Sequence, residues 1–124
     1  MAKTVLIVDD EQGMLRILTI ILQRAGYDIL TASNGDDALQ LLQSHHPDVV
    51  VLDDMMPGLS GGDLCTYIKQ EPTLRDIPVI MHSAGVNVKN SAWLEQIGAD
   101  GGLSKPCPAP VMMNTIAQCL ARGA

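Results

Sequence analysis

Short apolar segments rich in β-branched residues alternate with amphipathic segments along the whole chain. Continuous apolar character over four or five residues predicts strands that are covered on both faces, as in a parallel sheet. The expected strands are residues 4–8, 28–32, 48–52, 77–82 and a weaker one at 101–104. This alternation restricts the fold to an α/β class in which helices cover both faces of the sheet.

Between these segments, apolar residues recur at spacings of three and four, which predicts five helices. The helices are expected at residues 14–25, from 34 onward, and at 60–70, 87–97 and 108–122. Five strand–helix units in this order predict a doubly wound five-stranded parallel sheet with right-handed crossovers. The strand order 2-1-3-4-5 is expected from precedent among such sheets. We interpret residues 1–124 as a single domain, since this length suits one core.

Composition excludes several classes of function. The formal net charge is −6 and the eight Lys and Arg residues are scattered, which argues against direct nucleic-acid binding. No apolar run approaches the roughly 20 residues of a membrane span. No signal peptide is visible, so we expect a cytoplasmic protein without membrane contact. The three cysteines have no metal-ligand spacing.

Polar and charged residues follow four of the predicted strands. Asp9 and Asp10 follow the first strand, Asp53 the third, Ser83 the fourth and Lys105 the fifth. Any one of them has an ordinary explanation as a helix cap or loop residue. Because the carboxyl ends of parallel strands form one rim, their joint placement predicts a functional site there.

Physical chemistry limits what such a site can hold. Two carboxylates about 4 Å apart repel by roughly 1 kcal/mol in water and about 4 kcal/mol at an intermediate dielectric. Several converging carboxylates therefore require a cation or a raised pKa. Oxygen ligands favour Mg²⁺, which would also attract and neutralise a phosphoryl group. A carboxylate can act as the nucleophile in such chemistry, and lysine and serine can bind the phosphoryl oxygens.

Four segments resemble response-regulator receiver domains of two-component signalling, which have a flavodoxin-like fold. These are the acidic opening at 6–11, the strand and loop at 47–58, the strand at 77–84 and the lysine–proline segment at 98–106. The resemblance covers essentially the whole chain. It implies a Mg²⁺-dependent phosphoacceptor that receives its phosphoryl group from a histidine kinase or phosphotransfer protein and is not a turnover enzyme. The resemblance does not identify the downstream effector, and it leaves open whether an effector domain follows the last helix.

The resemblance also implies roles for individual residues. Asp53 is the phosphoacceptor, and Pro57, four residues later, sets this register in preference to Asp54. Ser83 would hydrogen-bond the phosphoryl group and Lys105 would pair with it.

The remaining implied roles concern the metal and the backbone. Asp10 would bind Mg²⁺ directly, Asp9 through water, Asp53 as a further ligand and Met55 through its carbonyl. The Lys105–Pro106 bond is expected to be cis, which would aim the lysine into the site.

The chain departs from the family pattern at two positions. Gly102 stands where the family usually has Tyr or Phe, and Cys107 replaces an aromatic residue after the proline. Glycine has no side chain that could rotate as a switch. We therefore hypothesise that signalling depends on the Ser83 loop and the fourth helix, or that partner binding responds less to phosphorylation.

The three histidines and the tryptophan are given no part in the predicted site. His45 and His46 are expected to end the second helix. His82 is interpreted as a packed, hydrogen-bonded residue pointing away from the site, rather than a phosphorelay histidine. The pattern leaves the role of Trp93 open between core and partner contact.

Three alternative functions differ in class. An aspartate phosphatase usually has Asp-x-Asp after its first strand, which is absent. A flavin carrier is disfavoured because the acidic first loop would repel a cofactor phosphate. A receiver-like interaction module that is not phosphorylated is the strongest alternative, and Gly102 keeps it open.

Overall fold

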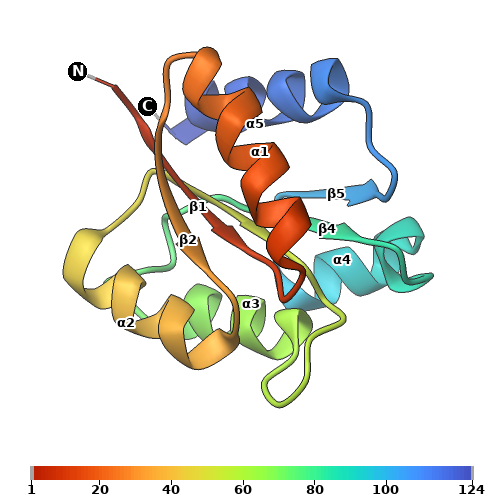
Figure 1. Cartoon of the computed structure of the whole chain (residues 1–124). Coiled ribbons are helices and arrows are strands. Elements are labelled where there is room, and N and C mark those ends of the chain that lie inside the picture. The colour runs from red at the N-terminus through yellow and green to blue at the C-terminus, as the bar shows by residue number, and fades with distance from the viewer. Residues whose placement is uncertain (1, 124) are drawn as a thin grey trace.

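A five-stranded parallel sheet forms the centre of the computed structural model, which describes residues 2–123 (Figure 1). The strand order is β2-β1-β3-β4-β5, as predicted. The strands are β1 (Thr4–Val8), β2 (Asp28–Ala32), β3 (Val49–Leu52), β4 (Val79–Ser83) and β5 (Gly101–Ser104). The fold therefore belongs to the flavodoxin-like class.

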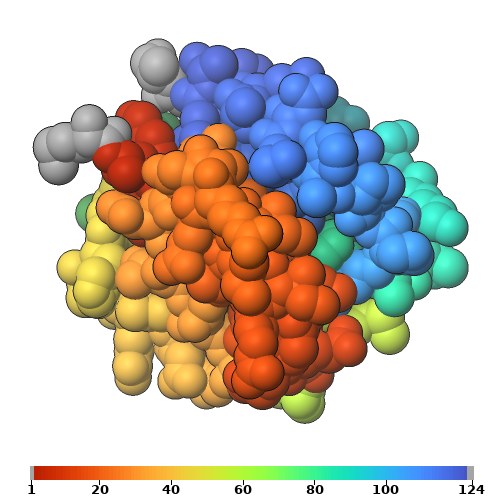
Figure 2. All heavy atoms as spheres, turned by 45° about the horizontal axis from the view of Figure 1, so that its top comes forward, coloured from red at the N-terminus to blue at the C-terminus, as the bar shows by residue number. Residues whose placement is uncertain are grey.

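Helices cover both faces of this sheet. On one face lie α1 (Gln12–Arg24) and α5 (Ala109–Gly123), whose orange and blue atoms meet in Figure 2. On the other lie α2 (Gly35–His45), α3 (Gly61–Gln70) and α4 (Ser91–Ile97). Two apolar clusters, one on each face, form the core. The central strand β3 is buried at every position, which explains its unbroken apolar sequence.

Three helix starts follow from capping residues. The side chains of Asn34, Ser60 and Asn90 each accept a hydrogen bond from the backbone N–H three residues later. The helix predicted at 87–97 is wrong as a continuous element. It is divided into a short 3-10 helix, η1 (Asn87–Lys89), and α4, because Asn90 is extended and begins a new helix.

Three predicted strand boundaries are also wrong, at the start of β3 and at both ends of β4. Asp48 lies outside β3, and its carboxylate accepts the Thr4 backbone N–H at 2.7 Å. Strand β4 begins at Val79, because Pro78 has no N–H and the Ile77 N–H bonds to the Leu74 carbonyl. Strand β4 also extends one residue further than predicted, because Ser83 still pairs with Ser104 of β5, so Ser83 is the last residue of the strand and not the first of the loop.

The second helix ends as expected, with His45 in its last turn and His46 in a left-handed conformation (φ 47°). Across residues 2–123, no helix combines the length and the apolar character needed to cross a membrane.

Candidate functional site

The sheet places two carboxylates next to each other at the carboxyl ends of β1 and β3. The Asp9 N–H bonds to the Ala32 carbonyl at 3.1 Å, and the Asp53 N–H bonds to the Val8 carbonyl at 2.9 Å. These bonds continue the strand pairing one residue beyond the strands. Both side chains are nevertheless buried, with Asp9 1% and Asp53 4% exposed.

Asp10 completes an acidic cluster with them. One carboxylate oxygen from each of Asp9, Asp10 and Asp53 lies within 4.8 Å of the others. Asp10 is exposed, so the cluster opens to solvent on its side. The three predicted acidic ligands are thus brought together.

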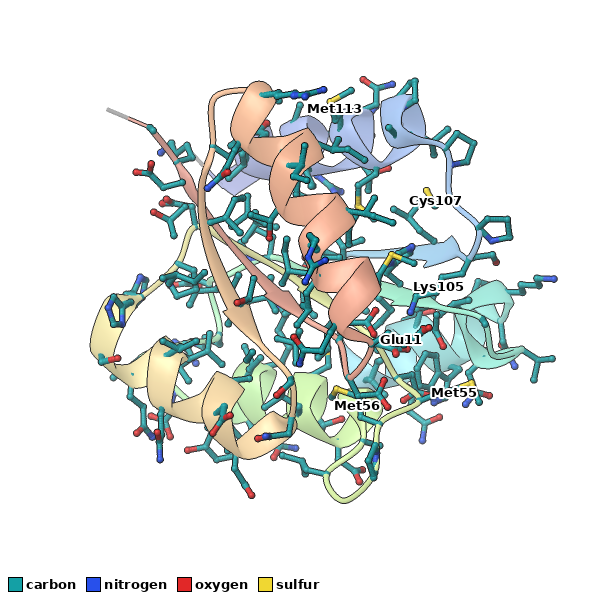
Figure 3. The ribbon with its side chains drawn as sticks, in the orientation of Figure 1. Glu11, Met55, Met56, Lys105, Cys107 and Met113 are labelled. Carbon is teal, nitrogen blue, oxygen red and sulfur yellow. The ribbon has the colours of Figure 1, made fainter. Side chains whose placement is uncertain are left out.

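Lys105 reaches this cluster from the end of β5 (Figure 3). Its ammonium lies 2.7 Å from Asp9 Oδ2, 3.5 Å from Asp53 Oδ2 and 3.5 Å from Glu11 Oε1. The Lys105–Pro106 peptide is cis, as predicted. One positive charge is thus set against three carboxylates, those of Asp9, Glu11 and Asp53.

Burial and these neighbours change the acidities. Burial raises the pKa of Asp53, and the charge of Asp9 adds to the increase, while the Met55 N–H and Lys105 oppose it. Burial alone would lower the pKa of Lys105. Its hydrogen bond to Asp9 and the charges of Asp53, Asp9 and Glu11 reverse that effect, so the pKa is raised and the lysine stays charged.

Ser83 lies on the neighbouring strand and is 1% exposed. Its hydroxyl oxygen accepts the Gly85 N–H at 3.1 Å, and its backbone carbonyl accepts the Lys105 N–H at 3.0 Å. The hydroxyl hydrogen stays available to an acceptor in the site. Ser83 and Lys105 are therefore tied together through the backbone.

A cavity of about 250 Å³ opens over the cluster. Its lining is formed by Asp10, Glu11, Asp53, Met55, Ala84 and Lys105. Met55 is 60% exposed, and Figure 3 shows its side chain at the same rim as Glu11 and Lys105. The Met55 N–H donates to Asp53 Oδ1 at 3.2 Å, whereas the predicted metal contact of its carbonyl stays a prediction.

Two residues of this lining had no assigned role in the sequence. Glu11 follows Asp10 directly. Its contact with Lys105 could not be predicted from the sequence, because the two residues are far apart in the chain. Ala84 follows Ser83 and offers no polar group as a signal.

The donor set suits a hard divalent cation. It consists of carboxylate oxygens without nitrogen or sulfur, with one member exposed, which is the arrangement that Mg²⁺ with retained waters prefers. The excess of negative charge over Lys105 also favours an added cation.

His82 is buried (3% exposed), as interpreted, but it is not remote from the site. Burial lowers its pKa to about 4; the charge of Lys105 lowers it further, against the opposing charge of Asp9. No hydrogen bond of its ring to another described residue is found, and the expected hydrogen bond stays a prediction. His82 is therefore a neutral buried imidazole within electrostatic reach of Lys105 and Asp9.

Gly102 lies where η1 and α4 approach β5. A Cβ at this position would be 2.7 Å from Leu94 Cδ1 and 3.0 Å from the Val88 carbonyl oxygen. Both are closer than ordinary van der Waals contact. The space beside β5 is thus filled by Leu94, and only glycine fits without displacement.

Comparison with known proteins agrees with this geometry. The family model described as "Response regulator receiver domain" matches residues 5–117. The alkaline phosphatase synthesis transcriptional regulatory protein PhoP of Bacillus subtilis is 36% identical over 86% of this chain. That match covers 43% of PhoP, so the chain spans less than half the length of this relative.

Two further proteins match over nearly their whole length. The polar-differentiation response regulator DivK of Brucella ovis is 31% identical, with 94% of each chain covered. A crystal structure described as a response regulator from Chloroflexus aurantiacus superimposes with a TM-score of 0.92 at 30% identity. It covers 98% of this chain and 100% of the other.

Proposed function

The chain belongs to the response regulator receiver domain family, and from that premise we propose that Asp53 accepts a phosphoryl group from a histidine kinase or phosphotransfer protein. One observation supports this most directly. Asp53 is buried beside the paired Asp9 and Lys105 and lines an open cavity, so the Lys105 ammonium and space for a phosphoryl group are both next to its carboxylate.

The transfer proceeds by attack of an Asp53 carboxylate oxygen on the phosphorus of the donor. The new P–O bond forms as the P–N bond to the donor imidazole breaks, and the imidazole keeps the electron pair and takes up a proton. Lys105 pairs with a phosphoryl oxygen, for which its ammonium moves only a short distance from Asp9. The Ser83 hydroxyl donates to another oxygen.

Asp9, Asp10, Asp53 and the Met55 carbonyl would hold Mg²⁺, with Asp9 acting through water. When bound, Mg²⁺ supplies the positive charge that offsets the transferring phosphoryl group. Burial and the charge of Asp9 raise the pKa of Asp53 against the Met55 N–H and Lys105, and a bound Mg²⁺ would favour the ionised carboxylate.

The aspartyl phosphate is proposed as a signalling state and not as an intermediate of turnover. The domain would catalyse its own phosphorylation and dephosphorylation and pass the signal to an unidentified effector by a conformational change. No direct role with nucleic acid or membranes is proposed, and a cytoplasmic location is expected.

A phosphorylation-independent interaction module is the second candidate. The observation in its favour is the Gly102 position, which Leu94 closes and which leaves no side chain on β5 to report on the site. The complete set of Asp9, Asp10, Asp53, Ser83 and Lys105 supports the phosphoacceptor more strongly.

The test is intact-mass measurement after incubation with Mg²⁺ and acetyl phosphate. We expect the wild type to gain one phosphoryl group only when Mg²⁺ is present, and Asp53→Asn to gain none. Asp54→Asn is the matched control, because it neutralises the adjacent carboxylate and should still be phosphorylated. A folded wild type that binds Mg²⁺ without gaining mass would favour the interaction module.

A further inference from the structure

The position that the family uses to carry its signal through β5 is closed in this chain. A Cβ at Gly102 would meet Leu94 and the Val88 carbonyl, so η1 and α4 rest directly on the strand. A change at Asp53 must therefore reach α4 through other contacts.

Asp54, the residue after Asp53, contacts two segments near α4 through its side chain. Its Oδ1 accepts the Gly62 N–H in the first turn of α3 at 2.8 Å. Its Oδ2 accepts from Asn87 Nδ2 in η1 at 3.4 Å. The Asp54 side chain thus connects the backbone next to Asp53 with α3 and with η1, which precedes α4.

The two contacts differ in firmness. The bond to Gly62 has an ordinary length. A Cβ at the preceding Gly61 would collide with the Asp53 carbonyl oxygen, so the start of α3 packs tightly against the backbone that follows β3. The contact with Asn87 is at the long end for an N–H···O bond, and Asn87 is exposed. A small shift of η1 is enough to break or tighten it.

Ser83 provides a reason for η1 to shift. Its hydroxyl oxygen holds the Gly85 N–H, two residues before Asn87. If Ser83 turns toward a phosphoryl group on Asp53, this bond weakens and the segment 84–87 is released from β4. Asn87 is then the residue of that segment that Asp54 holds.

We infer that Asp54 is a positioning residue that transmits the phosphorylation state of Asp53 to η1 and α4 through Asn87. This inference rests on the proposed function, since it describes how that same site is coupled to the surface. It assigns the coupling to a polar contact beside the site and not to a side chain on β5.

Trp93 gives the coupling a spectroscopic readout. It is the only tryptophan of the chain. A Cβ on Gly62 would lie 3.0 Å from Trp93 Cζ2, so the indole packs on the turn of α3 that Asp54 caps. The Asn90 side chain holds the Trp93 N–H at 3.2 Å, just after η1. Displacement of η1 and α4 against α3 therefore changes the environment of the indole.

The experiment compares the wild type, Asp54→Ala and Asn87→Ala, each with Mg²⁺ and acetyl phosphate. Intact mass gives the phosphorylated fraction, and tryptophan fluorescence is recorded on the same samples. Asp54, Asn87 and Trp93 line one surface cavity, and Asp63 lines it too. Asp63→Ala is therefore the matched control, because Asp63 has no bond to Asn87 among the described residues. Asn87→Ala should fold normally because its side chain is exposed, so it still tests the inference if Asp54→Ala does not fold.

We expect a fluorescence change in the wild type and in Asp63→Ala on phosphorylation. Asp54→Ala and Asn87→Ala should reach the same phosphorylated fraction and lose most of that change. Wild-type fluorescence changes in a fully phosphorylated Asn87→Ala would overturn the inference, as would a phosphorylated wild type with unchanged fluorescence. Failure of the wild type to gain mass would instead refute the proposed function, and the inference with it.

Discussion

The ammonium of Lys105 lies 2.7 Å from Asp9 Oδ2 and 3.5 Å from Asp53 Oδ2, so the lysine is bonded more closely to Asp9 than to the proposed phosphoacceptor. Both carboxylates and the lysine are largely buried, with 9% of the Lys105 side chain exposed. The lysine is thus the charge that makes two buried carboxylates tolerable when no metal is bound.

Replacing this lysine should make stability depend on Mg²⁺. Lys105→Met leaves Asp9 and Asp53 buried without a cation, and removal of one partner of a buried pair costs about 3 kcal/mol or more. We expect that loss in the free energy of unfolding at neutral pH without metal, measured by denaturant titration. Saturating Mg²⁺ should recover part of it. Lys89→Met, at an exposed lysine of η1, is the control and should change little. An equal loss with and without Mg²⁺ would contradict this account.

Metal binding should itself stabilise the domain. A ligand that binds only the folded state adds about 2.7 kcal/mol at one hundred times its Kd. Asp10 is exposed, so Asp10→Asn should fold normally yet gain less from Mg²⁺ than the wild type at every concentration. Thermal unfolding across a Mg²⁺ series measures this. Asp63→Asn removes an exposed carboxylate outside the cluster and should respond like the wild type; a reduced response there would point to a non-specific charge effect.

An aromatic residue at position 102 should not restore the usual family arrangement. In Gly102→Tyr the new Cβ would meet Leu94 and the backbone oxygen of Val88, and overpacking of this kind costs about 1–3 kcal/mol. We expect a lower midpoint of denaturation and altered NMR shifts in α4. Leu94→Ala in the same background should recover part of the loss, because it removes the closest atoms. A Gly102→Tyr variant as stable as the wild type would show that the packing is looser than described.

The sequence predicted the five strands and the polar residues at their carboxyl ends, while the sheet order came from precedent among such folds and Glu11 and Ala84 of the cavity lining were not foreseen. The strand-end positions of Asp9, Asp53 and Lys105 follow from where the apolar segments end in the chain, whereas their meeting at one site depends on the strand order. The break at Asn90 was not predicted, because the apolar pattern does not distinguish an asparagine that caps a new helix from an asparagine inside a helix. The proximity of Asp54 to Asn87 depends on how two loops pack, and no periodic pattern encodes that.

His82 links the site to acid stability. Its pKa is lowered from 6.5 to about 4 because burial penalises the charged imidazole, and Lys105 adds to the penalty. Below pH 6.5 the unfolded chain binds a proton at this histidine that the folded chain does not bind. The free energy of unfolding should therefore fall as the pH drops from about 6.5 to about 4. The displacement of the pKa corresponds to about 3 kcal/mol.

His82→Met fills the same apolar surroundings without a titratable group, so it should lose less stability than the wild type across this range. Urea titrations at several pH values between 6.5 and 4 measure the difference, which should grow steadily as the pH falls. Carboxylates that titrate in the same range are present in both proteins and largely cancel in the comparison. His45→Gln, at an exposed histidine of α2, should follow the wild type. Parallel pH profiles for the wild type and His82→Met would mean that the imidazole binds its proton equally well in the folded and unfolded chains, which would contradict this account.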